Sequence, residues 1–90
     1  MSDDNQESLL EFPCEFPVKM MGRVDDSFTV TAIALVEKHA GKIADDAIKT
    51  SPSRKGNFLS VTVTIVAESQ EQLDNIYRDL TEHDDILVAL

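Results

Sequence analysis

A short basic segment is the part of this sequence whose residue types are best suited to binding chemistry. Residues 51–57 read Ser-Pro-Ser-Arg-Lys-Gly-Asn, so two adjacent cations lie among small turn-forming residues in a 90-residue chain of formal net charge −9. Guanidinium and ammonium groups bind carboxylates and phosphates. We therefore expect Arg54, Lys55, Gly56 and Asn57 to form a docking point for an anion or an acidic partner. The alternative is an ordinary solvated turn.

The cysteine and the two histidines are spaced in a way that disfavours a metal or catalytic site. Cys14, His39 and His83 are far apart in the sequence, and no two of them have the short spacing of paired zinc ligands. Each histidine lies at or just after the end of a predicted helix, where an imidazole interacts favourably with the helix dipole. Glu15 follows Cys14 directly, and a thiolate needs basic neighbours instead. We therefore expect no metal and no cofactor.

Three pairs of adjacent aspartates are the remaining candidates for acid–base chemistry. They are Asp25-Asp26, Asp45-Asp46 and Asp84-Asp85. Neighbouring side chains of a strand point to opposite faces, so such pairs rarely converge on one proton. Their expected roles are helix capping and the protection of sheet edges. Because no nucleophile-elbow or phosphate-loop motif is present either, we expect the protein not to be an enzyme.

The charge is unevenly distributed along the chain. Residues 1–11 carry four acids and no Lys or Arg, residues 68–90 carry seven acids and one base, and the stretch between them has a net charge of +1. The overall acidity disfavours nucleic acids and anionic membranes. The segment that starts at Lys55 begins like an RNA-recognition strand, but Asn57 and Leu59 occupy the stacking positions and supply no planar ring. We therefore expect neither nucleic acid nor membrane as a partner.

The cellular compartment is predicted from the same composition. The chain has no apolar run of about 18 residues, and its first residues, MSDDNQES, are acidic and polar, unlike a signal peptide. The single cysteine has no intrachain partner for a disulfide. These features predict a reduced, cytoplasmic protein.

The elements that position these residues follow from the hydrophobic periodicity. Side chains alternate over residues 14–22, with Val18 on one side and Lys19 on the other, which predicts a half-buried strand that ends at Gly22. Pro17 lacks an N–H donor, so its nitrogen is expected to face an edge, a strand start or a bulge. A helix follows, with N-cap oxygens from Asp25–Ser27. Its apolar stripe consists of Phe28, Ala32, Leu35, Val36 and His39, and Gly41 is expected to end it.

The second half of the chain repeats this pattern. A weak strand is predicted over residues 43–50, then the 51–57 turn, then the strongest strand signal, over residues 59–65. Its two faces are Leu59, Val61, Val63 and Ile65 on one side, and Ser60, Thr62 and Thr64 on the other. Ser69 and Gln72 form a capping box before a second amphipathic helix that contains Leu73, Ile76, Tyr77 and Leu80. Residues 86–90 are predicted to be a short final strand.

The element order β-α-β-β-α-β predicts a two-layer, ferredoxin-like α+β sandwich. Right-handed crossovers place both helices on the same face of a four-stranded antiparallel sheet. The strands that start near residues 14 and 58 are then central, and the threonine-lined face is left open. We expect residues 1–8 to be a disordered or loosely packed acidic tail and residues 9–90 to form one domain.

Two segments resemble the YbeD-like family of small bacterial proteins. Residues 9–22 (LLEFPCEFPVKMMG) carry L-L-E-F-P-x-x-F followed by K-x-M-G, and residues 52–65 (PSRKGNFLSVTVTI) carry S-x-K-G-N-aromatic-x-S. The resemblance covers nearly the whole chain. It implies the same β-α-β-β-α-β fold in a soluble bacterial protein, and it implies no particular activity. That fold is similar to the ACT regulatory domain, which binds small ligands and usually pairs through its sheet edges, and residues 22–27 occupy the position of the ACT ligand loop.

Two functions are consistent with these observations. The first is a non-catalytic regulatory or adaptor module that binds another protein through the open sheet face, including Lys19, and through the 51–57 turn. The alternative is an ACT-type small-ligand (amino-acid) sensor that uses the 22–27 loop, with a homodimer formed through the sheet edges.

Overall fold

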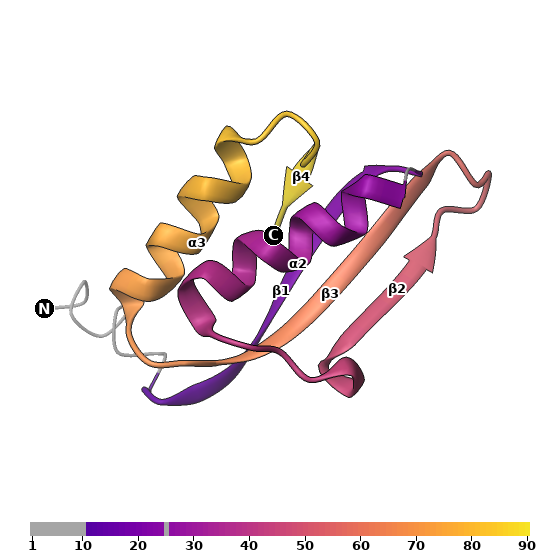
Figure 1. Cartoon of the computed structure of the whole chain (residues 1–90). Coiled ribbons are helices and arrows are strands. Elements are labelled where there is room, and N and C mark those ends of the chain that lie inside the picture. Colours follow the sequence, from indigo (N-terminus) through magenta and orange to yellow (C-terminus); the bar gives the residue numbers. More distant parts are fainter. Residues whose placement is uncertain (1–10, 25) are drawn as a thin grey trace, which may run out of the picture.

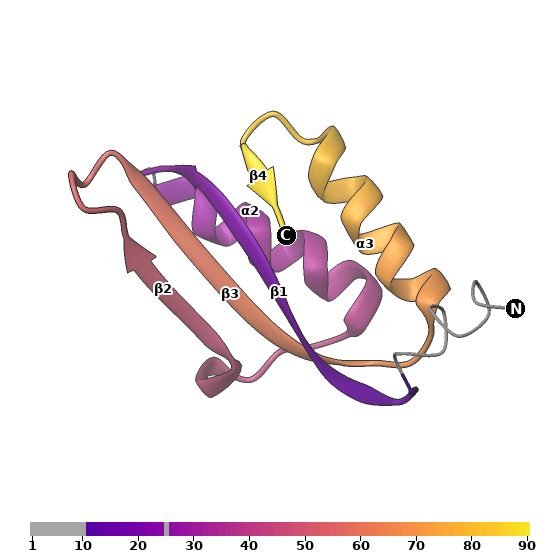
Figure 2. The same cartoon turned by 180° about the vertical axis from the view of Figure 1, so that it is seen from behind.

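The computed structural model describes residues 11–24 and 26–90, and it has the expected β-α-β-β-α-β order. Four strands form one sheet in the order β2-β3-β1-β4, and neighbouring strands are antiparallel. Both helices lie on one face and leave the other open, as the two opposite views show (Figure 1, Figure 2). The elements are β1 (Cys14–Arg23), α2 (Asp26–Ala40), the 3₁₀ turn η1 (Asp45–Ala47), β2 (Ile48–Pro52), β3 (Phe58–Ala67), α3 (Gln70–Glu82) and β4 (Val88–Ala89). The ferredoxin-like fold is therefore confirmed.

The two long central strands, β1 and β3, form the framework of the sheet. They pair from Cys14 opposite Ala67 to Arg23 opposite Phe58. Alternation puts Val18 and its partner on β3 against the helices, where both are fully buried. The apolar side chains on this face of β1 and β3, many of them β-branched, form the sheet side of the hydrophobic core.

The two helices cover this face of the sheet with the apolar stripes that their spacing predicts. Phe28, Ala32 and Val36 of α2 are buried, and so are Leu73, Ile76 and Leu80 of α3. Gly41 has a φ of 81°, the left-handed conformation that ends a helix at low cost for glycine. Of the expected N-cap residues of α2, Asp25 lies outside the described residues. Among the described residues, no helix has the length and apolar character needed to cross a membrane.

Several predicted strand ends were wrong. The strand predicted over residues 43–50 begins only at Ile48, because Asp45–Ala47 form a 3₁₀ turn whose Asp45 carbonyl accepts a hydrogen bond from the Ile48 N–H. At its other end this strand includes Ser51 and Pro52, which were assigned to the turn. The final strand contains only Val88–Ala89 instead of residues 86–90. Each of these strand ends depends on where pairing with a distant strand begins or stops. The local periodicity of the sequence carries no information about that pairing. The acidic tail predicted over residues 1–8 lies outside the described part of the chain.

The central strand β1 tolerates Pro17 because the neighbouring edge strand, β4, does not extend as far as this residue. The backbone groups of Lys19 and Met21 bond toward β4, with Lys19 N 3.3 Å from Leu90 O and Leu87 N 2.8 Å from Met21 O. Alternation turns the nitrogen of Pro17 to the same side, and β4 pairs only as far as Leu90. The missing N–H therefore falls beyond the end of the edge strand, so no ladder hydrogen bond is lost.

The turn between β2 and β3 is closed by Ser53. Its Oγ accepts from Phe58 N at 3.1 Å, its N–H donates to Phe58 O at 2.8 Å, and its carbonyl accepts from Gly56 N at 2.9 Å. Gly56 has a φ of 77°, which this tight turn requires and which a glycine adopts without strain. The hairpin is thus held by backbone groups and the Ser53 hydroxyl, and its basic side chains, Arg54 and Lys55, are left exposed.

Candidate binding surface on the open sheet face

The open face of the sheet is built from the alternate side chains that point away from the helices. On β3 these include Ser60, Thr62 and Thr64, which are half-buried, whereas Val61 and Val63 on the other side are fully buried. The polar side chains therefore line a surface that the described part of the chain leaves uncovered, as seen from behind (Figure 2). The predicted division of β3 into a core face and an open face is confirmed.

Two lysines lie in one row across the middle of this face. Thr62 pairs with Lys19 on β1 and with Lys49 on β2, so the two ammonium-bearing side chains start on either side of one threonine. Because neighbouring strands are about 4.8 Å apart, the two lysine Cα atoms are separated by roughly 10 Å. Both side chains are exposed. Lys19 was expected here, and Lys49 was not.

The basic turn lies several residues along the sheet from Lys19, whose partner on β3 is Thr62. The hairpin tip lies at one end of the sheet, where Val24 N donates to Asn57 O at 3.3 Å (Figure 2). Arg23, opposite Phe58 at the end of β1, lies between the tip and Lys19 along this face. Arg23 was missed because the predicted strand stopped at Gly22. Among the predicted site residues, Gly56 shapes the turn, and binding by any of them stays a prediction.

We define the basic face as the exposed cations Lys19, Arg23 and Lys49 on the open side of the sheet, together with Arg54 and Lys55 at the adjoining hairpin tip. They are five of the eight Lys and Arg residues of the chain. Within the described residues none of them forms an ion pair. The strands of the sheet contain one acid, Glu15, and it lies at the far end of β1, where it pairs with Val66. A chain that is acidic overall therefore presents a cationic surface on the open side of its sheet.

Apolar side chains border the basic face along β4. Met21 pairs with Val88, and Lys19 pairs through backbone hydrogen bonds with Leu90. Met21, Val88 and Leu90 are 38%, 42% and 72% exposed. We call these three residues the apolar strip. The Tyr77 hydroxyl donates to the Leu90 carbonyl and holds the end of this strip, and burial raises the pKa of Tyr77 above its ordinary value.

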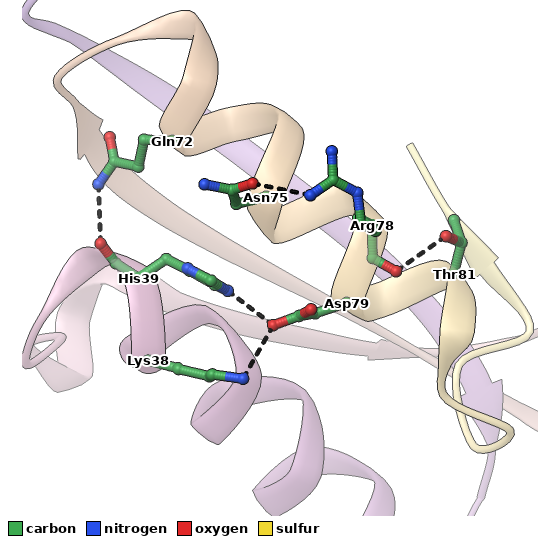
Figure 3. A network of polar contacts seen from close by, with 7 residues as sticks. All are labelled: Lys38, His39, Gln72, Asn75, Arg78, Asp79 and Thr81. Carbon is green, nitrogen blue, oxygen red and sulfur yellow. Dashed lines mark hydrogen bonds and ion pairs between the residues drawn. The ribbon is translucent and has the colours of Figure 1, made fainter.

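The helix layer carries the opposite charge and a different kind of polar arrangement. Helix α3 contains four acids and one base. Asp79 of α3 accepts from His39 Nε2 at 2.7 Å and lies 3.4 Å from Lys38 Nζ, both on α2 (Figure 3). The His39 hydrogen bond and the Lys38 charge hold the pKa of Asp79 below its ordinary value. This network joins the two helices. His39 lies in the last turn of α2, as expected, and the structure adds a hydrogen bond to Asp79, while its interaction with the helix dipole stays a prediction.

Gln72 makes the second link between the helices. Its backbone N–H donates to Ser69 Oγ at 3.1 Å, which confirms the predicted cap of α3. Its side-chain oxygen accepts from Glu68 N at 2.6 Å, and its amide nitrogen donates to His39 O at 3.1 Å (Figure 3). A single amide therefore closes the start of α3 and satisfies a carbonyl in the last turn of α2.

A small hollow lies where β1 passes into α2. It measures about 110 Å³ and is lined by Arg23, Ser27, Phe28, Asp84, Asp85 and Leu87. This is the region compared above with the ACT ligand loop. Gly22 precedes Arg23 in β1, and a Cβ atom there would approach the Phe28 ring to 2.5 Å. The glycine is therefore required by the packing of Phe28.

The remaining reactive residue types do not converge. Among the described residues, no group of three His, Cys, Asp or Glu side chains is placed to hold a metal ion. Cys14 is half-buried and packs against the core. His83 follows α3, and its Nδ1 accepts from Asp85 N at 3.2 Å, which orders the loop before β4.

Comparisons with known proteins show the family. Residues 7–90 match a family described as "Protein of unknown function (DUF493)". A UPF0250 protein of Neisseria gonorrhoeae is 47% identical over 87 residues, which cover 97% of this chain and 96% of the relative. A UPF0250 protein of Chromobacterium violaceum is 44% identical over 90 residues, which cover both chains completely.

A solved structure supports the fold. The solution structure of protein HP0495 from H. pylori superimposes with a TM-score of 0.72 over 100% of this chain and 94% of that chain, at 18% sequence identity. At that identity the likeness concerns the fold alone. The resemblance to the YbeD-like family is confirmed by the sequence matches. This chain belongs to the DUF493 family of bacterial proteins, whose curated relatives here are the UPF0250 proteins.

Proposed function

We propose that this protein is a non-catalytic adaptor or regulatory module of the cytoplasm that binds another protein through its open sheet face. The observation that carries this proposal is the separation of charge. Five of the eight basic residues of an acidic chain lie on the basic face, and the helix layer holds acids. Exposed charges of one sign on one face steer a partner of opposite sign and fix its orientation.

The shape of the open face also supports protein binding. It is a sheet surface of half-buried hydroxyl side chains with the apolar strip along one side. In stable protein complexes the interface combines apolar side chains with polar groups at its border. The sheet face thus offers a broad area of the type that another protein surface covers.

The test is capture of partners with a variant that blocks the middle of the face. Thr62→Trp places a bulky ring between Lys19 and Lys49, and Val30→Trp is the matched control on an exposed position of α2. Proteins captured from extract of the host cell by the unmodified chain should be lost with Thr62→Trp and retained with Val30→Trp. If both variants retain the same proteins, or if none is captured by the unmodified chain, the proposal is wrong.

A second function is supported by the charges around the β1–α2 hollow. Arg23, Asp84 and Asp85 all line it, and a cation together with carboxylates matches the carboxylate and ammonium groups of a free amino acid. Such a sensor would show a rise in melting temperature with one member of an amino-acid panel, since a ligand at 100 times its Kd adds about 2.7 kcal/mol to stability. Asp84→Asn should remove that rise, and Asp45→Asn, an exposed acid elsewhere, should not. No rise across the panel excludes the sensor.

A further inference from the structure

We propose that the open face recognises an acidic protein segment that also carries apolar side chains. This inference rests on the proposed function and specifies the chemistry of the partner. It is carried by the juxtaposition of the basic face and the apolar strip on one side of the sheet, which the pairing of β1, β3 and β4 brings together.

The cations define the acidic part of the partner. Lys19 and Lys49 flank Thr62, and no described side chain pairs with either of them. The two ammonium groups, carried by side chains whose Cα atoms are roughly 10 Å apart, are exposed to solvent, and their repulsion is screened at physiological ionic strength, where the screening length is about 8 Å. A carboxylate placed over Thr62 would interact with both ammonium groups at once and would also be within reach of the threonine hydroxyl. The row is thus suited to a single acidic side chain from outside.

The apolar strip defines the rest of the partner. Met21 follows Lys19 on the same face of β1, and Val88 and Leu90 lie opposite these two residues on the β4 side. An apolar side chain of the partner that covers Met21 and Val88 would therefore lie one row away from a carboxylate over Thr62. Rows on one face of a strand are about 7 Å apart, close to the spacing of alternate side chains in an extended segment. An acidic and an apolar residue two positions apart in an extended segment, whose side chains point to the same side, match this arrangement.

Two other occupants fit the surface less well. A second copy of this chain, stacked face to face, would oppose two basic faces and leave the cations repelling each other. A nucleic acid would offer phosphates but nothing to cover the apolar strip, and single-stranded bases require aromatic rings to stack on. Of the described strand residues that alternation turns toward the open face, Phe58 is aromatic, and it is half-buried.

The binding experiment uses two matched peptides. The first is a fluorescein-labelled dodecapeptide made of three Glu-Ser-Leu-Ser repeats, which places Glu and Leu on the same side when it is extended, and the second replaces each Glu with Gln. The full-length protein should bind the acidic peptide at least fivefold more tightly at 50 mM NaCl, and the difference should shrink at 300 mM NaCl because screening weakens the ionic contacts. Chemical-shift changes should concentrate on Thr62, Met21 and their neighbours on the open face. Equal affinity for both peptides overturns the inference.

Two double variants that have the same net charge as each other locate the peptide-binding site. Lys19→Glu combined with Lys49→Glu should raise the Kd of the acidic peptide at least fivefold. The control is Lys42→Glu combined with Arg78→Glu, which makes the same change in net charge at exposed positions outside the sheet. It should change the Kd less than twofold. Equal weakening by the two double variants would mean that net charge alone governs binding, and the inference would then be wrong.

Further measurements test the apolar strip and would identify other occupants of the face. Met21→Ser should weaken binding of the acidic peptide two- to threefold, and no change contradicts the assignment of the apolar strip. Tighter binding of a 12-nucleotide RNA than of the acidic peptide overturns the choice of protein as partner. A fivefold gain in peptide affinity when residues 1–10 are deleted also overturns it, because the chain's own acidic segment would then be the occupant.

Failure of this inference differs from failure of the proposed function. If Thr62→Trp loses a captured protein while the Lys19→Glu and Lys49→Glu double variant keeps it, the face binds proteins but does not select acidic ones. If Thr62→Trp loses nothing, the open face is not the binding surface and the proposed function itself fails.

Discussion

The helix layer and the open sheet face both carry charged side chains, but they use them differently. Between the helices, Asp79 is engaged by His39 and Lys38 (Figure 3). On the sheet, Lys19 and Lys49 have no described ionic partner. Charges that are already paired inside one molecule hold its elements together, whereas unpaired charges of one sign are available for contacts with another molecule. The comparison separates the part of this protein that maintains the fold from the part suited to binding.

Two adjacent methionines provide the largest expected contrast between the faces. Met20 points into the core and is 1% exposed, whereas Met21 lies on the open face. Met20→Ala should lower the free energy of unfolding by about 2–5 kcal/mol, because it leaves a cavity among buried side chains. Met21→Ala should cost less than about 1 kcal/mol, since water already reaches that side chain. Urea unfolding of the two variants measures the difference, and equal losses would contradict the assignment of the faces.

Gln72 allows a contrast of intermediate size within one helix. Gln72→Ala removes the side-chain hydrogen bonds to Glu68 N and His39 O, so it should lower the free energy of unfolding by roughly 1–2 kcal/mol. The control is Gln70→Ala, which loses only an exposed bond to Asp74 on the same helix, worth about 0.2–0.5 kcal/mol. A smaller loss for Gln72→Ala than for its control would show that the interhelical link contributes nothing.

Local pattern predicted the layers of this fold well. The alternation through Val61, Thr62 and Val63 identified both the core face and the open face of β3, because a buried and a solvated side of a strand select different side chains. The apolar stripes of α2 and α3 were equally informative. Each of these signals is carried by residues near one another in the sequence, so no knowledge of distant pairing is needed to recognise it.

The candidate surface was less predictable because it depends on pairing between distant residues. Lys49 lies in one row with Lys19 only because both residues pair with Thr62 of β3, Lys49 from the edge strand β2 and Lys19 from the central strand β1. The weak strand had been predicted to start several residues early, so Lys49 had no defined face. Arg23 was missed because Gly22 resembles a strand end, whereas the glycine in fact accommodates the Phe28 ring. The interhelical partner of His39 is likewise far away in sequence and left no local signal.

Acidification should weaken the helix layer selectively. The pKa of Asp79 is lowered in the folded protein, so its ionised form stabilises the fold above its ordinary value of 3.8, and this contribution is lost as the pH falls through the lower, folded value. The difference in free energy of unfolding between the unmodified protein and Asp79→Asn should therefore decrease between pH 6 and pH 3. Asp45→Asn is the control at an exposed acid outside the network. A difference that stays constant with pH would mean that the Asp79 charge does not contribute to the link between the helices.

The smallest expected effect on stability concerns the basic face itself. Lys19→Gln and Lys49→Gln remove exposed charges with no described ionic partner, so each should change the free energy of unfolding by less than about 0.5 kcal/mol. The free energy of unfolding of the double variant should be unchanged or slightly higher, because a weak repulsion across Thr62 is removed. The same double variant should nevertheless weaken binding of the acidic peptide. Thermal unfolding measured alongside peptide titration separates the two quantities. A double variant that unfolds easily and binds normally would reverse the division of roles between the two layers.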